Sequence, residues 1–375
     1  MCCPGNMRSR PGPLVFALEN HKAFKSGLDM NFETFWSFAN SFLLQWQQAG
    51  SRLFYWNLIS TLFLVFAWSA FSFGTRTSFQ KSLSFIFRKR YWWNRSTLKD
   101  YWFFTTNFFL KVVLFLPVLD FSYHIARGVS GKLVDWNQSF LGLEASFFAV
   151  ALFTLGSFVW DDFLRFVHHL LMHKVPFLWR LHQVHHSAKI LTPLTLYRAH
   201  PLEVAMATLR NSLSIGISAG MFVFFFESSL NLWTLAGVNA FGFVFNFLGA
   251  NLRHSHIPLG FGSLIEKIFI SPKQHQIHHS ANPEHWDRNY GVSLALWDGI
   301  FGSLVLSKNT GKLKFGLGSV QNRSLLKEYG LDLKSCKTVW KSQVGPRPNR
   351  VFSDSKDHIP WAPHKDSESF QTVSP

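Results

Sequence analysis

The sequence has 375 residues, of which 47% are hydrophobic and only 15% are charged, and its formal net charge is +16. Soluble proteins carry roughly 25% charged residues, and a basic nucleic-acid-binding protein places its cations on polar segments. Here the cations lie in short stretches beside hydrophobic runs, as they do in loops that face anionic lipid headgroups. The composition therefore predicts a membrane protein and argues against a nucleic-acid partner.

Five apolar stretches approach the length of a membrane-spanning helix, which needs about 20 residues. In chain order they are Leu53–Phe73, Trp102–Phe121, Ser139–Trp160, Val204–Phe226 and Leu230–Ala250. The second contains Lys111 and Asp120, the third contains Glu144, and the last two flank Glu227, which predicts a helical hairpin. We therefore expect an all-α, multi-pass membrane bundle of about four to five spanning or hairpin helices.

The connection between the first two stretches is the most basic short loop of the chain. It contains Arg76, Lys81, Arg88, Lys89, Arg90, Arg95 and Lys99. The positive-inside rule places such a loop in the cytosol. Counting the later stretches then places residues 161–203 and everything after residue 252 on the same side, so we expect a cytosolic histidine-rich cap that binds metal.

Histidines recur in four groups within these two cytosolic segments. His169 and His173 are four residues apart, so they lie on one face of a helix. The triplet His182, His185 and His186 is repeated roughly ninety residues later as His275, His278 and His279, and both have i, i+3, i+4 spacing. His254 and His256 directly follow the last apolar stretch.

The number of imidazoles exceeds what a single metal ion binds, because zinc in proteins usually takes about four ligands. The groups therefore predict two metal ions in one pocket. Imidazole suits iron, zinc and copper, and the three cysteines, Cys2, Cys3 and Cys336, offer no spacing for an iron–sulfur cluster. A single HxxxH pair would be weak evidence for a metal site. One triplet alone would also fit a pH-responsive cluster. Two triplets on one side of a membrane favour metal binding.

This arrangement resembles the fatty acid hydroxylase/sterol desaturase superfamily of membrane di-iron oxygenases. The motifs that carry the resemblance are Asp162-Phe163 followed by His169–His173, HQVHHS at 182–187, the single-histidine region at 254, and SPKQHQIHHS at 271–280. Two flanking stretches, RAHPLE at 198–203 and NYGVSLALWDGIFGS at 289–303, are also similar. The resemblance covers roughly residues 140–305.

The resemblance implies nine metal ligands, which are His169, His173, His182, His185, His186, His254, His275, His278 and His279. The sequence departs from the family pattern at Leu170, where arginine is common, so His168 stays an alternative to His169. His256 likewise stays an alternative to His254.

Further polar residues near the motifs are candidates for contacting the ligands or the substrate. They are His200, His285, Asp161, Asp162, Asp287 and Asp298, and the aspartates have helix capping or ordinary loop charge as an equal alternative.

By resemblance, the protein is an O2-dependent, iron-dependent oxidoreductase that hydroxylates or desaturates a C–H bond of a lipid, such as a sterol or a fatty acyl chain. The cofactor is a di-iron centre, in which zinc can replace iron on isolation. No haem or flavin motif is present, so an external electron donor of the cytochrome or ferredoxin type is expected. A membrane zinc hydrolase is one alternative, but HExxH is absent. A metal transporter or sensor is another, but it needs ionisable residues deep within the spans.

These features divide the chain into four parts. We expect an N-terminal region at 1–51, N-terminal transmembrane helices with the basic loop at 52–138, a catalytic domain like that of the superfamily at 139–308, and a polar C-terminal tail at 309–375.

Overall fold

The computed structural model describes residues 52–73, 84, 86–226, 232–308, 310–311 and 313–317. All of them lie in the first of two compact units, Met1–Tyr329, and the second unit is Gly330–Pro375. The predicted N-terminal region and most of the predicted tail fall outside the described residues. Within the described residues the chain is all-α, as predicted, and strand pairing is limited to two isolated β-bridges, Phe269 with Leu294 and Ser280 with Phe315.

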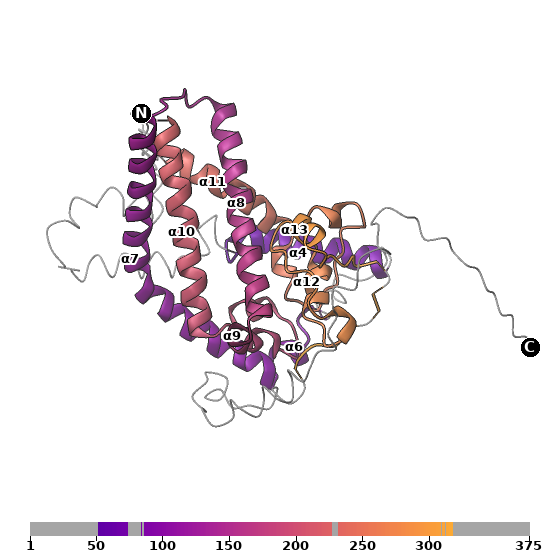
Figure 1. Cartoon of the computed structure of the whole chain (residues 1–375). Coiled ribbons are helices and arrows are strands. Elements are labelled where there is room, and N and C mark those ends of the chain that lie inside the picture. The colour runs from indigo at the N-terminus through magenta and orange to yellow at the C-terminus, as the bar shows by residue number, and fades with distance from the viewer. Residues whose placement is uncertain are drawn as a thin grey trace, which may run out of the picture. The chain divides into compact units, whose positions relative to one another are not determined.

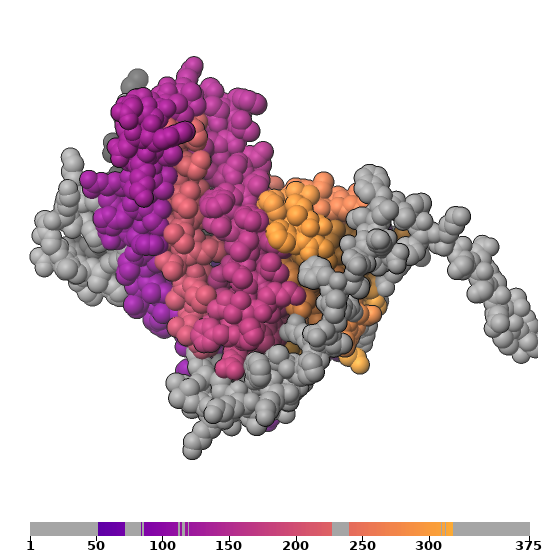
Figure 2. All heavy atoms as spheres, in the orientation of Figure 1, coloured from indigo at the N-terminus to yellow at the C-terminus, as the bar shows by residue number. Residues whose placement is uncertain are grey.

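The longer helices precede a region of short ones (Figure 1). In chain order, the helices of the first part are α4 (Tyr55–Phe73), α6 (Lys89–Trp92), α7 (Arg95–Asn137), α8 (Phe147–Lys174), α9 (Pro176–His186), α10 (Pro201–Phe226) and α11 (Leu232–Phe247). All of these except α6 are longer than the helices that follow. The shorter ones are α12 (Pro272–His278), α13 (Leu296–Ile300) and the 3-10 turns η2 (Pro193–Tyr197), η3 (Ala250–Leu252), η4 (Ile265–Lys267) and η5 (Pro283–His285). Helix α10 lies between α7 and α8, and Figure 2 shows the three side by side on one face.

Two helices, α8 and α10, are long and apolar enough to cross a membrane, and α4 is a shorter apolar helix. The predicted span Trp102–Phe121 lies within α7, which continues for 43 residues. The predicted span Leu230–Ala250 corresponds to α11, which has only 16 residues. Each predicted stretch therefore contains a helix in its described part, but two of the five have the length and hydropathy of a complete span.

The third predicted span begins later than its hydrophobicity indicates. Helix α8 starts at Phe147 and not at Ser139, because residues 139–146 have no regular secondary structure and pair with the end of α10. The backbone amides of Leu141 and Leu143 donate to the carbonyls of Phe224 and Phe225, at 3.0 and 2.8 Å. These bonds satisfy terminal carbonyls that α10 itself leaves unpaired. Helix α8 then runs on to Lys174 and so carries the first histidine motif.

Two glycines allow α10 to approach α7 closely. A Cβ atom added at Gly220 would lie 2.5 Å from the carbonyl oxygen of Ala126, and one added at Gly216 would lie 2.7 Å from Cβ of Ile125. Small residues four apart permit this kind of close helix–helix contact. The spacing explains why α10 packs along α7 without bulky side chains between the backbones.

We expect Gly220→Ala to lower the free energy of unfolding by about 1–3 kcal/mol, because the added methyl overfills the contact between the two helices. The matched control is Gly156→Ala on α8, where an added Cβ meets nothing within 4 Å. That change should stabilise the protein by up to about 1 kcal/mol through helix propensity. Denaturant unfolding in detergent measures both, and equal shifts of the same sign would contradict the close α7–α10 contact.

Candidate metal centre

The nine predicted ligands converge in two groups of buried or nearly buried imidazoles. The first, called the five-histidine group, comprises His169, His173, His182, His186 and His278. The second, called the four-histidine group, comprises His185, His254, His275 and His279. Within each group the ring nitrogens that face one another all lie within 4.8 Å. Each group therefore has the size of a metal-binding site.

The two HxxHH triplets contribute to both groups in a crossed manner. Helix α9 places His182 and His186 in the five-histidine group but His185 in the four-histidine group. Helix α12 and its C-cap do the reverse, since His275 and His279 join the four-histidine group and His278 joins the other. In each triplet the two residues four apart serve one group and the middle residue serves its neighbour. The sequence predicted a shared pocket, and the structure adds this crossing.

The two groups are neighbours. The rings of His186 and His279, one from each group, stack with centroids 4.4 Å apart and planes 23° apart. The rings of His185 and His186 are 5.6 Å apart, and those of His278 and His279 are 5.4 Å apart. Two ions bound in these groups would therefore share one pocket.

The structure distinguishes between the alternatives that the sequence left open. His169 belongs to the five-histidine group and His168 to neither. His254 lies at the centre of the four-histidine group, whereas His256 stacks on the ring of Tyr91 with centroids 3.9 Å apart and planes at 9°. These placements favour His169 and His254 as ligands.

The nitrogen positions fit a cation in the four-histidine group. Nε2 of His254 lies 3.1 Å from Nε2 of His185, 3.0 Å from that of His275 and 3.2 Å from that of His279. A ring nitrogen has one N–H or one lone pair, so it cannot hydrogen-bond to all three. Around an ion with metal–nitrogen bonds of about 2.1 Å, ligand nitrogens at right angles are about 3.0 Å apart. The observed spacing matches that arrangement.

In the five-histidine group, buried nitrogen atoms without hydrogen-bond partners also indicate a metal site. Nε2 of His173 and Nε2 of His278 are buried and have no hydrogen-bond partner among the described residues. Buried polar atoms without partners are rare in proteins. Coordination to a metal ion would satisfy both nitrogens, so the residues present fit a metal here as well.

Backbone carbonyls orient several of the imidazoles. Nδ1 of His169 is 2.7 Å from the carbonyl oxygen of Tyr290, and Nδ1 of His278 is 2.8 Å from that of Arg288. Nδ1 of His185 is 3.2 Å from the carbonyl oxygen of Arg198. A carbonyl only accepts, so Nδ1 carries the proton and Nε2 keeps its lone pair for a metal.

Burial keeps the ligands neutral. It lowers the pKa of His182 to about 3 and that of His185 to about 4. Burial, followed by the charges of neighbouring histidines, also holds the pKa of His275 and His279 well below the usual 6.5. At neutral pH these rings are therefore uncharged and able to bind a cation.

Glu203 is a site residue that the sequence analysis did not select. Its Oε1 atom lies 2.7 Å from Nδ1 of His182, and both side chains are largely buried. A carboxylate that holds the outer nitrogen of a metal-binding histidine fixes the ring and raises its basicity. Glu203 was part of the RAHPLE stretch, but nothing local to it indicated a partner 21 residues away.

We expect Glu203→Gln to weaken metal affinity about 10–100-fold, because the amide supplies no negative charge to His182. Titration against a competing chelator measures the change. Glu284→Gln is the matched control, since Glu284 is 76% exposed and lies 3.8 Å from His285, which belongs to neither group. Unchanged affinity in Glu203→Gln would contradict this role.

The predicted aspartates mainly support the loops around the site. Asp162 accepts hydrogen bonds from the amides of Ser293 and Leu294, at 2.9 and 3.0 Å, and from Nε1 of Trp297. Asp298 accepts from the amide of Tyr290 at 2.8 Å. Both therefore fix the segment whose Tyr290 carbonyl orients His169.

The other predicted residues lie around the two groups. Asp161 pairs with Arg165, at 2.6 Å, and Asp287 pairs with Lys174, at 3.1 Å. The ring of His200 accepts a hydrogen bond from the amide of Leu202, at 3.1 Å. His285 is buried outside both groups.

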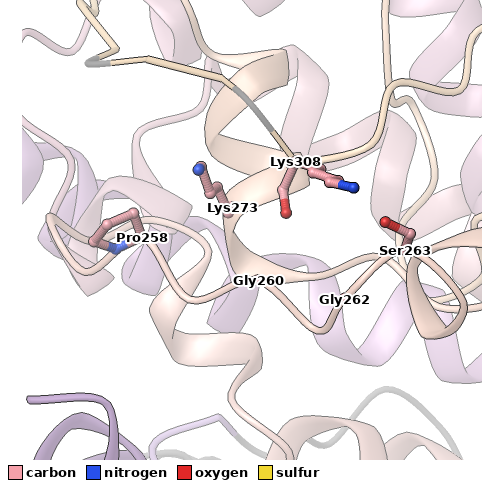
Figure 3. A pocket seen from close by; sticks show the side chains of 7 residues that line it. Pro258, Gly260, Gly262, Ser263, Lys273 and Lys308 are labelled. Carbon is pink, nitrogen blue, oxygen red and sulfur yellow. The ribbon is translucent and has the colours of Figure 1, made fainter. Parts of the chain in front are cut away.

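A separate cavity of about 350 Å³ opens beside α12 (Figure 3). It is lined by Pro258, Gly260, Gly262, Ser263, Lys273, Ser307 and Lys308. None of the nine histidines lines it, so this cavity is distinct from the two histidine groups.

Two adjacent groups of buried, neutral imidazoles in a helical frame define a candidate two-metal centre. Residues 154–303, which contain all nine histidines, match the family model for fatty acid hydroxylase. This match and the similarity to lipid-modifying enzymes support the fatty acid hydroxylase superfamily, the resemblance predicted from the motifs.

Related proteins are lipid-modifying enzymes by name. The chain is 27% identical over 191 residues to an alkylglycerol monooxygenase of Xenopus tropicalis, which covers 50% of this chain and 37% of the relative. It is 29% identical over 162 residues to the alkylglycerol monooxygenase of Homo sapiens, a match that covers 43% of this chain and 32% of the relative. It is 28% identical over 142 residues to an ornithine lipid hydroxylase of Rhizobium tropici, covering 38% of each.

The chain spans less than half the length of these curated relatives. No solved structure matches it.

Proposed function

We propose that the protein is a membrane-bound lipid hydroxylase that uses O2 and a pair of iron ions. The observation that carries the proposal is the pair of adjacent histidine groups within a segment of the fatty acid hydroxylase family. The names of the relatives, alkylglycerol monooxygenase and ornithine lipid hydroxylase, favour hydroxylation over desaturation. The overall reaction consumes a lipid C–H bond, O2, two electrons and two protons, and it yields an alcohol and water.

Iron is the metal that the family resemblance implies, and an all-imidazole donor set suits it. When bound, the ions would supply O2 activation for attack on an unactivated C–H bond. His169, His173, His182, His186 and His278 would hold one ion, and His185, His254, His275 and His279 would hold the other.

The chain's own residues would hold the site rigid and exclude bulk water. Glu203 would fix His182, and the carbonyls of Tyr290, Arg288 and Arg198 would fix three other rings. Burial of the ligand rings limits access by water, which protects a reactive oxidant from side reactions. Electrons would come from an external donor of the cytochrome or ferredoxin type.

We further propose that α7 and α8 cross the membrane and that α10 and α11 enter it as a helical hairpin, with both triplets on the cytosolic side. A reporter fused after Arg90 or after Lys308 is then expected in the cytosol, and one fused after Gly128 on the opposite side. Accessibility of the three fusions to a membrane-impermeant label measures this. Labelling of the two triplet-bearing segments from opposite sides of the membrane would separate the triplets and contradict the shared pocket.

Incorporation of labelled oxygen tests the reaction itself. Iron-loaded protein with a reducing system, a mixed lipid extract and O2 carrying the heavy oxygen isotope should yield a hydroxylated lipid that contains one labelled atom. His169→Ala should abolish the product, and the neighbouring His168→Ala should retain it. Product formed without O2, with oxygen derived from water, would indicate a hydrolase and contradict the proposal.

A further inference from the structure

Among the described residues, two arginines are the largest fully buried side chains, and their surroundings differ. Arg198 donates to Asp100 at 3.0 Å, to Oγ of Ser187 at 2.8 Å and to the carbonyl of Val184 at 3.1 Å. Nε and Nη2 of Arg253 are buried without any hydrogen-bond partner among the described residues. The contact of its guanidinium is with the ring of Phe245, at 4.3 Å.

An unpaired buried charge is unfavourable, and proteins normally pair it with an ion or a ligand. The charged groups that act on Arg253 include Arg52, which is also cationic, and the acid Asp162. The oxygens of Asp162 accept from the amides of Ser293 and Leu294, and among the described residues no hydrogen bond or ion pair joins Asp162 to Arg253.

Arg253 is fixed next to the four-histidine group. It directly precedes His254, and Nε2 of Gln276, on α12, donates to the carbonyls of Leu252, Ser255 and Ile257 at 3.2, 3.0 and 2.8 Å. These bonds hold the segment around Arg253 against the helix that carries His275.

A second cation lies near this segment. Nη1 of Arg52 is 3.4 Å from the carbonyl of Ala250, and Nδ2 of Asn251 donates to the carbonyl of Arg52 at 3.0 Å. The two arginines thus add positive charge on the side of the four-histidine group where α4 and α11 meet.

We propose that Arg253 binds an oxyanion of the phosphate or carboxylate type beside the four-histidine group. A guanidinium matches such a group by donating two parallel N–H bonds to two of its oxygens. The oxyanion belongs either to a lipid headgroup or to a free anion, and naming a lipid as its source rests on the proposed function. In that case Arg253 fixes the acidic end of the substrate relative to the metals.

Thermal unfolding of the metal-loaded full chain tests this inference without measuring turnover. The probes are inorganic phosphate, phosphatidic acid in micelles and oleate in micelles, with phosphatidylcholine as the neutral reference. The wild-type protein should show a saturable rise in unfolding temperature with at least one acidic probe. A response to inorganic phosphate identifies a free anion, and a response to the acidic lipids alone identifies a headgroup.

Arg253→Met should unfold in anion-free buffer at the wild-type temperature or above, because it replaces an unpaired charge with an apolar side chain. It should also lose the response to the probes. Arg253→Lys keeps the positive charge but lacks the planar guanidinium, so it should bind the acidic probe about tenfold more weakly. Arg198→Met, which removes a paired arginine, should be less stable in every buffer.

Three outcomes would overturn the inference. They are a wild-type protein that responds to none of the probes, an Arg253→Met variant that responds as the wild type does, and an Arg253→Met variant destabilised like Arg198→Met. The second would mean that the anion binds the metals, and the third that Arg253 is structural. A lack of lipid hydroxylation would leave this readout unchanged, so the two proposals fail separately.

Discussion

His254→Ala is expected to remove one of two bound metal ions and to lower turnover by more than about 100-fold, since even the loss of a residue that only orients a ligand costs 10–100-fold. Nε2 of His254 lies within 3.2 Å of three other ligand nitrogens, so no neighbour can replace it. His256→Ala, two residues away, should keep both ions, because it removes only the stacking on Tyr91.

Elemental analysis and turnover of the two purified variants provide the comparison. Full metal content in His254→Ala, or loss of an ion in His256→Ala, would contradict the assignment of the four-histidine group. The crossed triplets extend the test. His185→Ala should lose the same ion as His275→Ala, although it lies in the other triplet, and His278→Ala should lose the other ion.

Asp100→Asn is expected to lower the free energy of unfolding by about 3–5 kcal/mol, because it leaves the charge of Arg198 buried and unpaired. Asp100 is fully buried and also accepts a hydrogen bond from Thr195, at 2.8 Å. Since the carbonyl of Arg198 orients His185, the variant should also bind metal less tightly in the four-histidine group.

Denaturant unfolding measures the effect of this substitution. The control is Asp120→Asn, on the same helix, where the carboxylate is exposed and contacts His124 at 3.4 Å. An exposed pair of this kind contributes at most about 1 kcal/mol. If both variants unfold alike, the buried Asp100–Arg198 pair does not hold the site together.

Eight of the nine candidate ligands stand at helical spacing, which is local, and the resemblance to the superfamily implied His254. Residues three and four apart share a face, so the triplets at 182–186 and 275–279 could be recognised without a structure. Which triplet member serves which group depends on the orientation of α9 relative to α12, and spacing within one helix does not encode it. For the same reason, the sequence did not indicate the contact of Glu203 with His182 or that of Asp100 with Arg198, because the partners are 21 and 98 residues apart.

Helix boundaries were less predictable than helix existence. Hydrophobicity reports contact with lipid or core, whereas a helix continues until its backbone hydrogen bonds are interrupted. Helix α7 therefore runs through Lys111, Pro117 and Asp120 to Asn137, and Gln138 ends it in the left-handed conformation, with φ at 64°. Residues 139–146 are apolar enough to be counted as part of a span, yet they have no regular secondary structure.

Mössbauer spectroscopy of protein loaded with the Mössbauer-active isotope of iron tests the two-metal account most directly. Two neighbouring ions held by different numbers of imidazoles should give two iron signals of equal abundance, with two ions per chain. His254→Ala should remove one signal and leave the other. A single iron signal at one ion per chain, or a spectrum that His254→Ala leaves unchanged, would contradict the two crossed histidine groups as the metal centre.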